Sequence, residues 1–182
     1  MLTKPVIYVD MDGVLTDLDA SWRAMFGRSL TDKIQPGQGG IDAHKLDWLS
    51  FVDACGFETL EPIKGSGHLC MALDQLKTEF DIEICILTAA GGYQTMADVA
   101  TQKILWLQNQ CIDYGPIVVP YSHMKQVFAD PKALLIDDLD RNCEQFRARG
   151  GSAIQHSHHA VEATVMDARA WCMIKADLKR KG

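Results

Sequence analysis

The stretch Val6-Ile7-Tyr8-Val9-Asp10-Met11-Asp12-Gly13-Val14-Leu15-Thr16-Asp17 indicates how the whole chain is organised. It begins with four β-branched or aromatic residues, the composition of a buried strand. We expect it to leave extended geometry at Gly13, just after the carboxylates Asp10 and Asp12. Asp and Gly are ordinary turn residues, but a plain turn does not explain why a buried strand ends in acids, which need a partner or a metal ion. Carboxylates at the carboxyl end of a parallel strand are typical of a site in an α/β sheet.

The bulk composition is that of an ordinary globular protein. The chain has 182 residues, of which 47% are hydrophobic and 23% charged, so we expect one domain, or one domain with a modest insertion, and no disorder. A net charge of −6 argues against binding a nucleic acid polymer. No segment approaches the roughly 20 apolar residues of a membrane span, and the N-terminal residues do not resemble a signal peptide.

The six cysteines are scattered and form no C-x-x-C pair. Their spacing therefore indicates neither a zinc site nor a redox motif. Several of them lie in apolar segments, where a cysteine acts as a small hydrophobic residue that stays reduced. This usage predicts a cytoplasmic location. The residues concerned are Cys55, Cys70, Cys85, Cys111, Cys143 and Cys172.

Segments with strand and helix patterns alternate along most of the chain. Apolar runs bounded by turn residues predict strands at residues 6–9, 82–88, 116–120, 133–136 and 152–155. Helical spacing predicts helices that begin near Ser66 and that span about 94–110, 141–149 and 161–175. This alternation predicts an α/β fold with a doubly wound parallel sheet.

The segment that follows the first strand has a different pattern. Leu18, Trp22 and Phe26 recur at helical spacing, and residues 41–55 form a second helical segment. A loop rich in Gly, Gln and Asp separates them at residues 31–40. No part of this segment resembles a strand of a parallel sheet.

We therefore predict two parts. Residues 1–13 and 61–182 form the core, and residues 14–60 form a small helical cap inserted after the first strand. The cap is rich in aromatic rings, and we expect most of them to form its own hydrophobic core.

Polar residues end three of the predicted strands. Because the carboxyl ends of parallel strands meet at one edge of a sheet, we expect these residues to share one crevice. A loop lysine precedes the last of them. The candidate residues are Asp10, Asp12, Thr88, Lys125, Asp137 and Asp138.

In this order the residues resemble the four motifs of the haloacid dehalogenase-like (HAD) phosphohydrolases. Residues 10–17 are similar to the first motif, D-x-D-G-[TV]-[LV], and Ile86-Leu87-Thr88 is similar to the second. Lys125 matches the third motif, and Leu134-Leu135-Ile136-Asp137-Asp138 matches the fourth. Each motif alone is a weak signal, whereas four in the family order are a strong one. The resemblance implies a Rossmann-like core with a helical cap, and an enzyme that hydrolyses phosphate monoesters.

The resemblance also implies roles for the first two acids. Asp10 would attack phosphorus and form an aspartyl-phosphate, which is a recognised covalent strategy. Asp12 would protonate the leaving oxygen and then take a proton from the water that hydrolyses the intermediate.

A magnesium ion is expected at the acidic cluster. Like charges crowd around the phosphate there, which only a hard cation with oxygen ligands makes tolerable. The resemblance gives Mg²⁺ the Asp10 carboxylate, the Asp12 backbone carbonyl and one member of the pair Asp137-Asp138, with Asp138 preferred.

The remaining motif residues would hold the phosphate. Thr88, with Ala89 next to it, would contact a phosphoryl oxygen, and Lys125 would offset negative charge. Lys103 is an alternative for the motif lysine, but it lies in a long predicted helix, where a lysine is usually solvated. We therefore favour Lys125.

Within the HAD phosphohydrolases the chain is similar to the 5′(3′)-deoxyribonucleotidases. Residues 60–65 and the K-x-x-W-[LV] pattern at 103–107 carry this resemblance, in addition to the motifs. The chain departs from it at Ala89, where those enzymes commonly have Ser, at Leu18, where they have an aromatic residue, and at His123, where they have Arg. The resemblance thus implies the chemistry more firmly than the substrate.

The expected partner is a small phosphate monoester, namely a nucleoside monophosphate. We expect Trp22 to contact its base, because this ring lies one helical turn after Leu18. Two alternatives remain open: a phosphatase for a sugar phosphate or a nucleic-acid end, and a non-catalytic phosphate-binding module on the same fold. The sequence does not fix the oligomeric state, for which a homodimer is one option.

Overall fold

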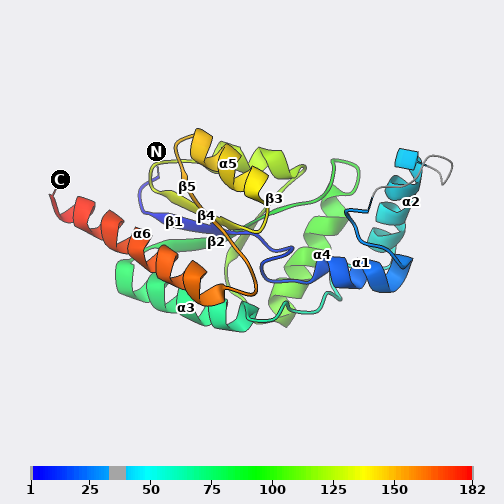
Figure 1. Ribbon diagram of the computed structural model, residues 1–182, viewed down its shortest axis with the longest axis horizontal. Coiled ribbons are helices and arrows are strands. Elements are labelled where there is room, and N and C mark those ends of the chain that lie inside the picture. Colours follow the sequence, from blue (N-terminus) through cyan, green and yellow to red (C-terminus); the bar gives the residue numbers. More distant parts are fainter. Residues whose placement is uncertain (1, 33–39, 182) are drawn as a thin grey trace.

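A parallel sheet of five strands forms the centre of the computed structural model, which describes residues 2–32 and 40–181 (Figure 1). Its strand order is β3-β2-β1-β4-β5, and all neighbouring strands are parallel. The predicted α/β fold with a doubly wound parallel sheet is therefore confirmed. The strands are β1 (Val6–Val9), β2 (Glu83–Ala89), β3 (Gly115–Val119), β4 (Ala133–Asp137) and β5 (Ser152–Gln155).

Helices cover both faces of the sheet, as the continuous apolar composition of its strands requires. In Figure 1, α3 and α6 lie along one face, and α5 lies on the other. Among the described residues, no helix combines the length and apolar character needed to span a membrane. The helices are α1 (Leu18–Phe26), α2 (Gly40–Asp53), α3 (Ser66–Phe80), α4 (Met96–Asn109), the 3₁₀ helix η1 (Ser122–Phe128), α5 (Asp140–Ala148) and α6 (Val161–Lys181).

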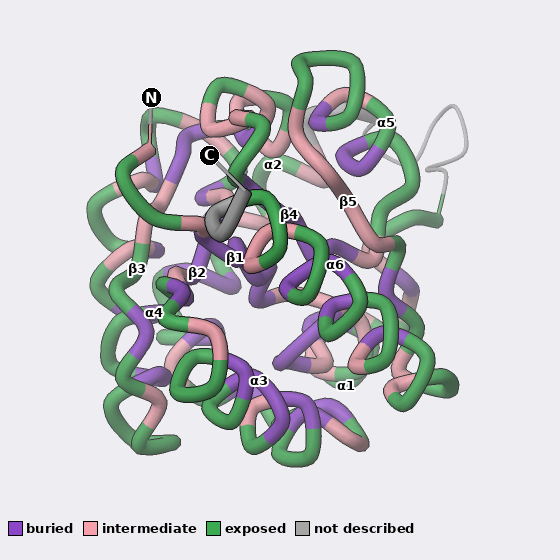
Figure 2. Tube along the Cα trace, turned by 90° about the vertical axis from the view of Figure 1, so that its left-hand side faces the viewer, coloured by how far each residue is buried: buried purple, intermediate pink, exposed green. Residues whose placement is uncertain are grey.

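Alternating side chains of β1 enter two hydrophobic clusters. Ile7 and Val9 join the large cluster that includes residues of α3, α4 and α6, whereas Val6 and Tyr8 join the smaller cluster beneath α5 and η1. Figure 2 shows the resulting pattern, with buried strands at the centre and exposed outer faces on the surrounding helices. Burial on both faces holds β1 rigidly, so its carboxyl end is a fixed platform for the residues that follow it.

The segment inserted after β1 carries α1 and α2, which lie beyond the carboxyl ends of the strands (Figure 1). Trp22 packs against Phe26 and Phe51 at ring-centroid distances of 4.5 and 5.5 Å. The buried rings of this segment belong to the same cluster as the sheet residues. The predicted loop at 31–40 lies largely outside the described residues. The division into a core and a 14–60 cap remains a prediction.

Side chains of α4 fasten this inserted segment to the sheet. The Gln102 side chain accepts the backbone N–H of Phe57 at 3.1 Å and donates to the carbonyl of Val52 at 2.7 Å. Trp106 Nε1 donates to the carbonyl of Leu60 at 2.7 Å. These buried bonds satisfy backbone groups that have left regular structure. They therefore fix the end of α2 relative to the strand ends.

Candidate active site

Asp10 lies directly after β1, almost fully buried. Its Oδ1 accepts the backbone N–H of Met11 at 2.7 Å, and its Oδ2 lies 2.6 Å from Lys125 Nζ. Both carboxylate oxygens are thus held by donors, and the side chain has one defined orientation. A carboxylate fixed in this way can act as a nucleophile of constant geometry.

The turn after Asp10 places Asp12 beside it. Gly13 has φ +79° in this turn, and a Cβ there would lie 2.4 Å from Asp138 Oδ2, so only glycine fits. Asp12 Oδ1 accepts a hydrogen bond from Thr16 Oγ1 at 3.2 Å, while Asp12 Oδ2 lies 2.5 Å from Lys103 Nζ. The glycine therefore allows the first and last acidic segments to approach closely.

Lys125, in η1, is buried between two carboxylates. Its Nζ lies 2.6 Å from Asp10 Oδ2 and 2.7 Å from Asp137 Oδ2. Burial alone would lower the pKa of Lys125, but the charges of Asp10 and Asp137 outweigh it and raise this pKa above its ordinary value. The lysine consequently stays charged at neutral pH.

Asp137 is the last residue of β4 and is fully buried. Its two carboxylate oxygens accept hydrogen bonds from Asn142 Nδ2 at 3.0 and 3.1 Å, and Oδ1 also accepts the backbone N–H of Leu139 at 3.0 Å. With Lys125 on Oδ2, this carboxylate is surrounded by protein donors. It is better placed to hold Lys125 than to bind a cation.

Asp138 has the opposite environment. Within residues 2–32 and 40–181, its carboxylate receives no hydrogen bond from another residue. Burial, followed by the charges of Asp10 and Asp137, raises the pKa of Asp138 to about 7. Asp138 thus has a raised pKa, lies close to like charges and has no hydrogen-bond donor from another described residue. This is the environment expected of a metal ligand.

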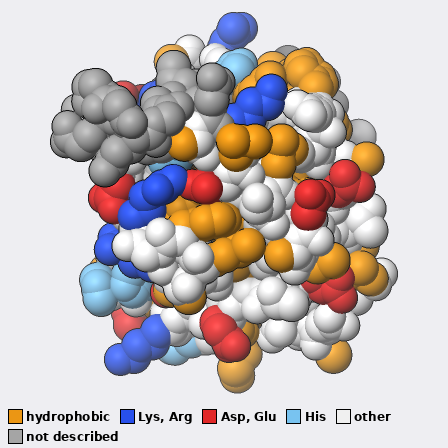
Figure 3. Space-filling model, turned by 90° about the vertical axis from the view of Figure 1, so that its right-hand side faces the viewer, with side chains coloured by type: hydrophobic (Ala, Val, Ile, Leu, Met, Phe, Trp, Pro, Cys, Tyr) orange, Lys and Arg blue, Asp and Glu red, His pale blue; other side chains and the backbone are white. Residues whose placement is uncertain are grey.

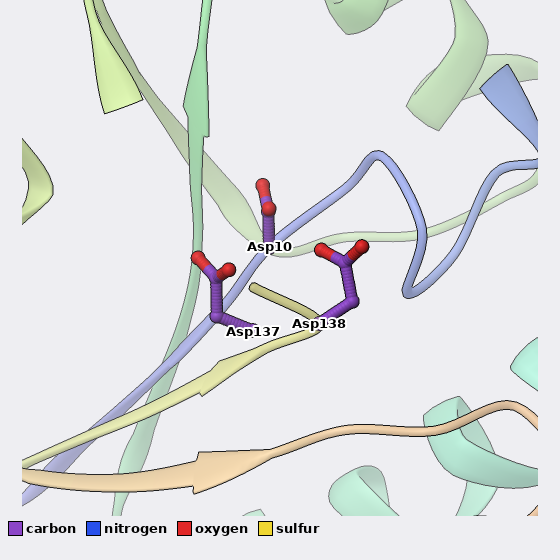
Figure 4. Close-up of side chains that lie close together, drawn as sticks. All are labelled: Asp10, Asp137 and Asp138. Carbon is purple, nitrogen blue, oxygen red and sulfur yellow. The ribbon is translucent and has the colours of Figure 1, made fainter. Parts of the chain in front are cut away.

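The three acids form one cluster. Oxygen atoms of Asp10, Asp137 and Asp138 lie within 4.8 Å of one another, and Figure 4 shows the carboxylates on the same side of the strand ends. This donor set fits a hard cation such as Mg²⁺. Asp10 and Asp138 fit best as ligands, because each oxygen of Asp137 already has two donors. Each oxygen of Asp10 has one donor, and the carboxylate of Asp138 has none from another described residue.

Thr88 and Ala89 end β2 next to Asp12. Thr88 Oγ1 lies 2.7 Å from Lys103 Nζ, and the carbonyl of Ala89 lies 3.0 Å from the same nitrogen. The structure thus brings the predicted residues Asp10, Asp12, Thr88, Ala89, Lys125, Asp137 and Asp138 to one edge of the sheet.

Lys103 is the residue that our sequence interpretation missed. We expected a solvated helical lysine, but its exposed fraction is 0%, and it contacts Asp12 and Thr88. The buried face of α4 carries Val99, Lys103 and Trp106, whereas the apolar side chain of Ile104 is exposed. Val99, Gln102 and Trp106 stand at positions that share a helix face with Lys103. This spacing would have predicted that Lys103 is buried.

A cavity of about 870 Å³ is lined by Asp10, Asp12, Ala89, Lys125 and Asp138. Leu18, Leu30 and Trp48 line it from the inserted segment, and Tyr121 and His123 line it from the segment after β3. Figure 3 shows this end of the molecule, where hydrophobic side chains lie among charged ones. The cavity is therefore acidic at its base and partly aromatic at its walls.

The prediction that Trp22 contacts the substrate is wrong in this structure. Trp22 is fully buried and packs against Phe26 and Phe51, so it does not reach the cavity. Trp48 lines the cavity instead, with Nε1 donating to Thr95 Oγ1 at 3.1 Å. Its ring lies against Gly91, where a Cβ would come within 2.3 Å of Trp48 Cζ2.

Tyr121 and His123 form a second aromatic surface at the cavity. Their rings stack with an interplanar angle of 13° and a centroid distance of 5.7 Å. Tyr93 contacts Tyr121 edge-on at 5.5 Å. These contacts fix the orientation of Tyr121, which is partly exposed and can receive a flat group.

A family model described as "5' nucleotidase, deoxy (Pyrimidine), cytosolic type C protein" matches residues 4–178 of the chain. No curated protein matches the chain. Among solved structures, the chain is similar to a hydrolase from Pseudomonas syringae, at 17% identity and a TM-score of 0.46, over 81% of this chain and 82% of that one. It is also similar to the HAD domain of the effector protein Lem4 from Legionella pneumophila, at 13% identity and a TM-score of 0.48, over 94% and 97%.

Proposed function

Because the chain belongs to the family of cytosolic type C deoxy 5′-nucleotidases and is therefore a phosphatase, we propose that it hydrolyses deoxynucleoside monophosphates through an aspartyl-phosphate on Asp10. The observation that carries this proposal is the position of Asp10 at the base of the cavity. There its carboxylate is held by Met11 N–H and by Lys125, with Asp12 in the next turn. A module that only bound phosphate would need no such nucleophile.

In the first step, an Asp10 oxygen attacks phosphorus and the bond from phosphorus to the ester oxygen breaks. The electron pair of that bond goes to the leaving oxygen, which takes a proton from Asp12. Thr88 and Lys125 hold the phosphoryl oxygens, and positioned charges of this kind supply most of the catalysis in phosphoryl transfer. The products are a free nucleoside and phosphorylated Asp10.

In the second step, water attacks the phosphorus of phosphorylated Asp10. Asp12, now a carboxylate, takes the proton of this water, and the bond between Asp10 and phosphorus breaks. Inorganic phosphate leaves, Asp10 regains its charge, and Asp12 regains the proton it will need for the next turnover.

Mg²⁺ is the cation that fits the acidic cluster. Asp10, Asp138 and the backbone carbonyl of Asp12 would hold it, while Asp137 orients Lys125. When bound, it neutralises the crowded negative charge of the acids and the phosphate. The raised pKa of Asp138 supports this assignment, because it reflects a charge that the protein itself leaves uncompensated.

The cavity supports a nucleoside as the leaving group. A volume of about 870 Å³ lies within the range of small-molecule sites, roughly 300–1,000 Å³. Trp48 and Tyr121 offer flat surfaces to a base, which compensates for the absence of an aromatic residue at Leu18. The family description names deoxy and pyrimidine substrates in the cytosol, and we propose the same substrates and compartment for this chain.

Phosphate release with Mg²⁺ tests the proposal. We expect deoxynucleoside monophosphates to be hydrolysed faster than sugar phosphates, and Asp10→Asn to be inactive. Asp140→Asn is the matched control, because Asp140 is exposed at the start of α5 and does not line the cavity. If no ester in the panel releases phosphate, the proposed activity is wrong. If only sugar phosphates are hydrolysed, the nucleotide assignment is wrong.

A further inference from the structure

Lys103 contacts the two residues that flank the proposed phosphate position without reaching the cavity. It lies in α4, its side chain is fully buried, and it does not line the cavity. Its Nζ lies 2.5 Å from Asp12 Oδ2, 2.7 Å from Thr88 Oγ1 and 3.0 Å from the carbonyl oxygen of Ala89. The proposed reaction gives this lysine no role, although its Nζ lies 2.5 Å from Asp12 Oδ2.

The three contacts use the full capacity of the ammonium group. A lysine has three N–H donors and no acceptor, and each donor has one oxygen here. No donor remains for a phosphoryl oxygen. Lys103 must therefore act through Asp12 and Thr88, unlike Lys125, which lines the cavity.

The first consequence concerns Thr88. Its Oγ1 accepts a hydrogen bond from Lys103, so its own O–H is free to donate to a phosphoryl oxygen. The lysine thereby selects which way the hydroxyl hydrogen points.

The second consequence concerns Asp12. Lys103 holds Oδ2 and Thr16 holds Oδ1, so the carboxylate cannot rotate without losing a bond on each side. Proton transfer to and from a reacting oxygen requires that kind of fixed geometry.

Lys103 is itself held in place from the inserted segment. The ring of Phe57 lies 5.0 Å from its Nζ, in the geometry of a cation–π contact. The backbone N–H of Phe57 is bound by Gln102, the neighbour of Lys103 in α4. The turn after α2 and the orientation of Asp12 are therefore linked through one side chain.

We propose that Lys103 is a positioning residue that orients the Asp12 carboxylate and the Thr88 hydroxyl for phosphoryl transfer. The proposal rests on the proposed function, in which Asp12 protonates the leaving oxygen. It gives different roles to Lys125 and Lys103: Lys125 offsets charge at the nucleophile, and Lys103 aligns the groups that move the proton and hold the phosphate.

The test compares Lys103→Met with the wild type on two esters. Methionine has a similar volume, but removing one partner of a buried ion pair costs stability, so near-ultraviolet circular dichroism checks that the variant still folds. A deoxynucleoside needs a proton to leave, whereas p-nitrophenolate leaves without one. We expect the first-turnover rate to fall roughly 50-fold or more on the nucleotide and about tenfold or less on p-nitrophenyl phosphate, with KM changed by less than about threefold.

Two controls accompany this measurement. Lys77→Met removes an exposed lysine of α3 and should leave both rates unchanged. Lys103→Met in an Asp12→Asn background should cost less than about threefold more, because residues that act as a unit are not additive. Lys103→Gln, which keeps amide donors, is the second variant should Lys103→Met fold poorly.

Equal losses on both esters would overturn the proposal, and so would full additivity with Asp12→Asn. Loss of the near-ultraviolet circular dichroism signal in both Lys103 variants would overturn it as well, since the lysine would then be structural. Failure of the wild type to hydrolyse any ester counts against the proposed function, which keeps the two failures distinct.

Discussion

The candidate site has two halves that differ in charge balance. In the first half, the buried Lys125 forms ion pairs with Asp10 and Asp137. The third acid of this cluster, Asp138, has no ion pair among the described residues. In the second half, Asp12 has a lysine of its own, Lys103. The first half therefore carries an excess of negative charge and the second does not.

This difference indicates a division of labour. Excess negative charge around the nucleophile can be relieved by a divalent cation, and the raised pKa of Asp138 marks where the compensation is missing. The charge of Asp12, in contrast, is offset by Lys103, and its two oxygens are held by Lys103 and Thr16. A carboxylate with this fixed orientation suits proton transfer. We infer that the metal belongs to the first half and the proton to the second.

The largest expected effect is that of Asp10→Asn. The amide has nearly the same shape but is a poor nucleophile, so we expect kcat to fall by roughly 10⁴-fold or more with the fold intact. Steady-state phosphate release checks this, and circular dichroism checks the fold. Substantial turnover by the purified variant would refute covalent catalysis by Asp10.

The second-largest effect is expected when Mg²⁺ is removed from the acidic cluster of the first half. We expect a chelator to abolish turnover and Mg²⁺ to restore it. Asp138→Asn should lower activity at least roughly 100-fold and raise the Mg²⁺ concentration needed for half-maximal rate, because it deletes a proposed ligand. Full activity in a metal-free preparation would show that the acidic cluster has a different purpose.

A smaller effect is expected at the cavity wall. Base–aromatic stacking contributes about 1–3 kcal/mol, so Trp48→Ala should lower kcat/KM for a deoxynucleoside monophosphate roughly 5- to 150-fold. The same change should leave p-nitrophenyl phosphate nearly unaffected. Leu46→Ala is a useful control, since Leu46 is an exposed residue of α2 that does not line the cavity. Equal losses on both substrates would mean that Trp48 merely packs the inserted segment.

The smallest expected effect is the pH dependence of stability. The pKa of Asp138 is about 7 in the folded protein, against an ordinary value of 3.8. Between these values the folded state binds more protons than the unfolded state, so this group favours folding below about pH 4 and loses that contribution as pH rises to about 7.

We therefore expect the Tm without metal to fall by roughly 3 °C or more between pH 5 and pH 8. Mg²⁺ should reduce the fall, because it favours the ionised carboxylate. Asp138→Asn should also reduce it, since the amide does not titrate. An equal fall in the wild type and in this variant would show that Asp138 is not its cause.

The sequence predicted much of the sheet and of the acidic cluster, for physical reasons. Strand β1 is apolar on both faces, so its composition alone indicates a buried parallel strand. The acids after β1 and β4 stand out because buried carboxylates need compensation. Such local signals do not depend on how distant segments pack.

The residues that the sequence did not predict depend on helix rotation. Lys103 was assigned to the solvent because a lysine within a long helix is usually solvated, and only the rotation of α4 in the fold places it on the buried face. Trp22 and Trp48 are both rings at helical spacing, and only tertiary packing decides which one faces the cavity. Likewise, the hydrogen bonds of Asn142 distinguish Asp137 from Asp138, and they are not visible in the sequence.

The most direct test of the two-halves account is a search for phosphorylated Asp10 in the Asp12→Asn variant. Mixed with p-nitrophenyl phosphate and Mg²⁺, this variant should release p-nitrophenolate in a burst of about one equivalent, since the first step needs no proton from Asp12. The second step lacks its base, so mass spectrometry of the acid-quenched protein should find one phosphoryl group on the peptide that contains Asp10. Steady release of both products, with no burst and no modified peptide, would contradict the account.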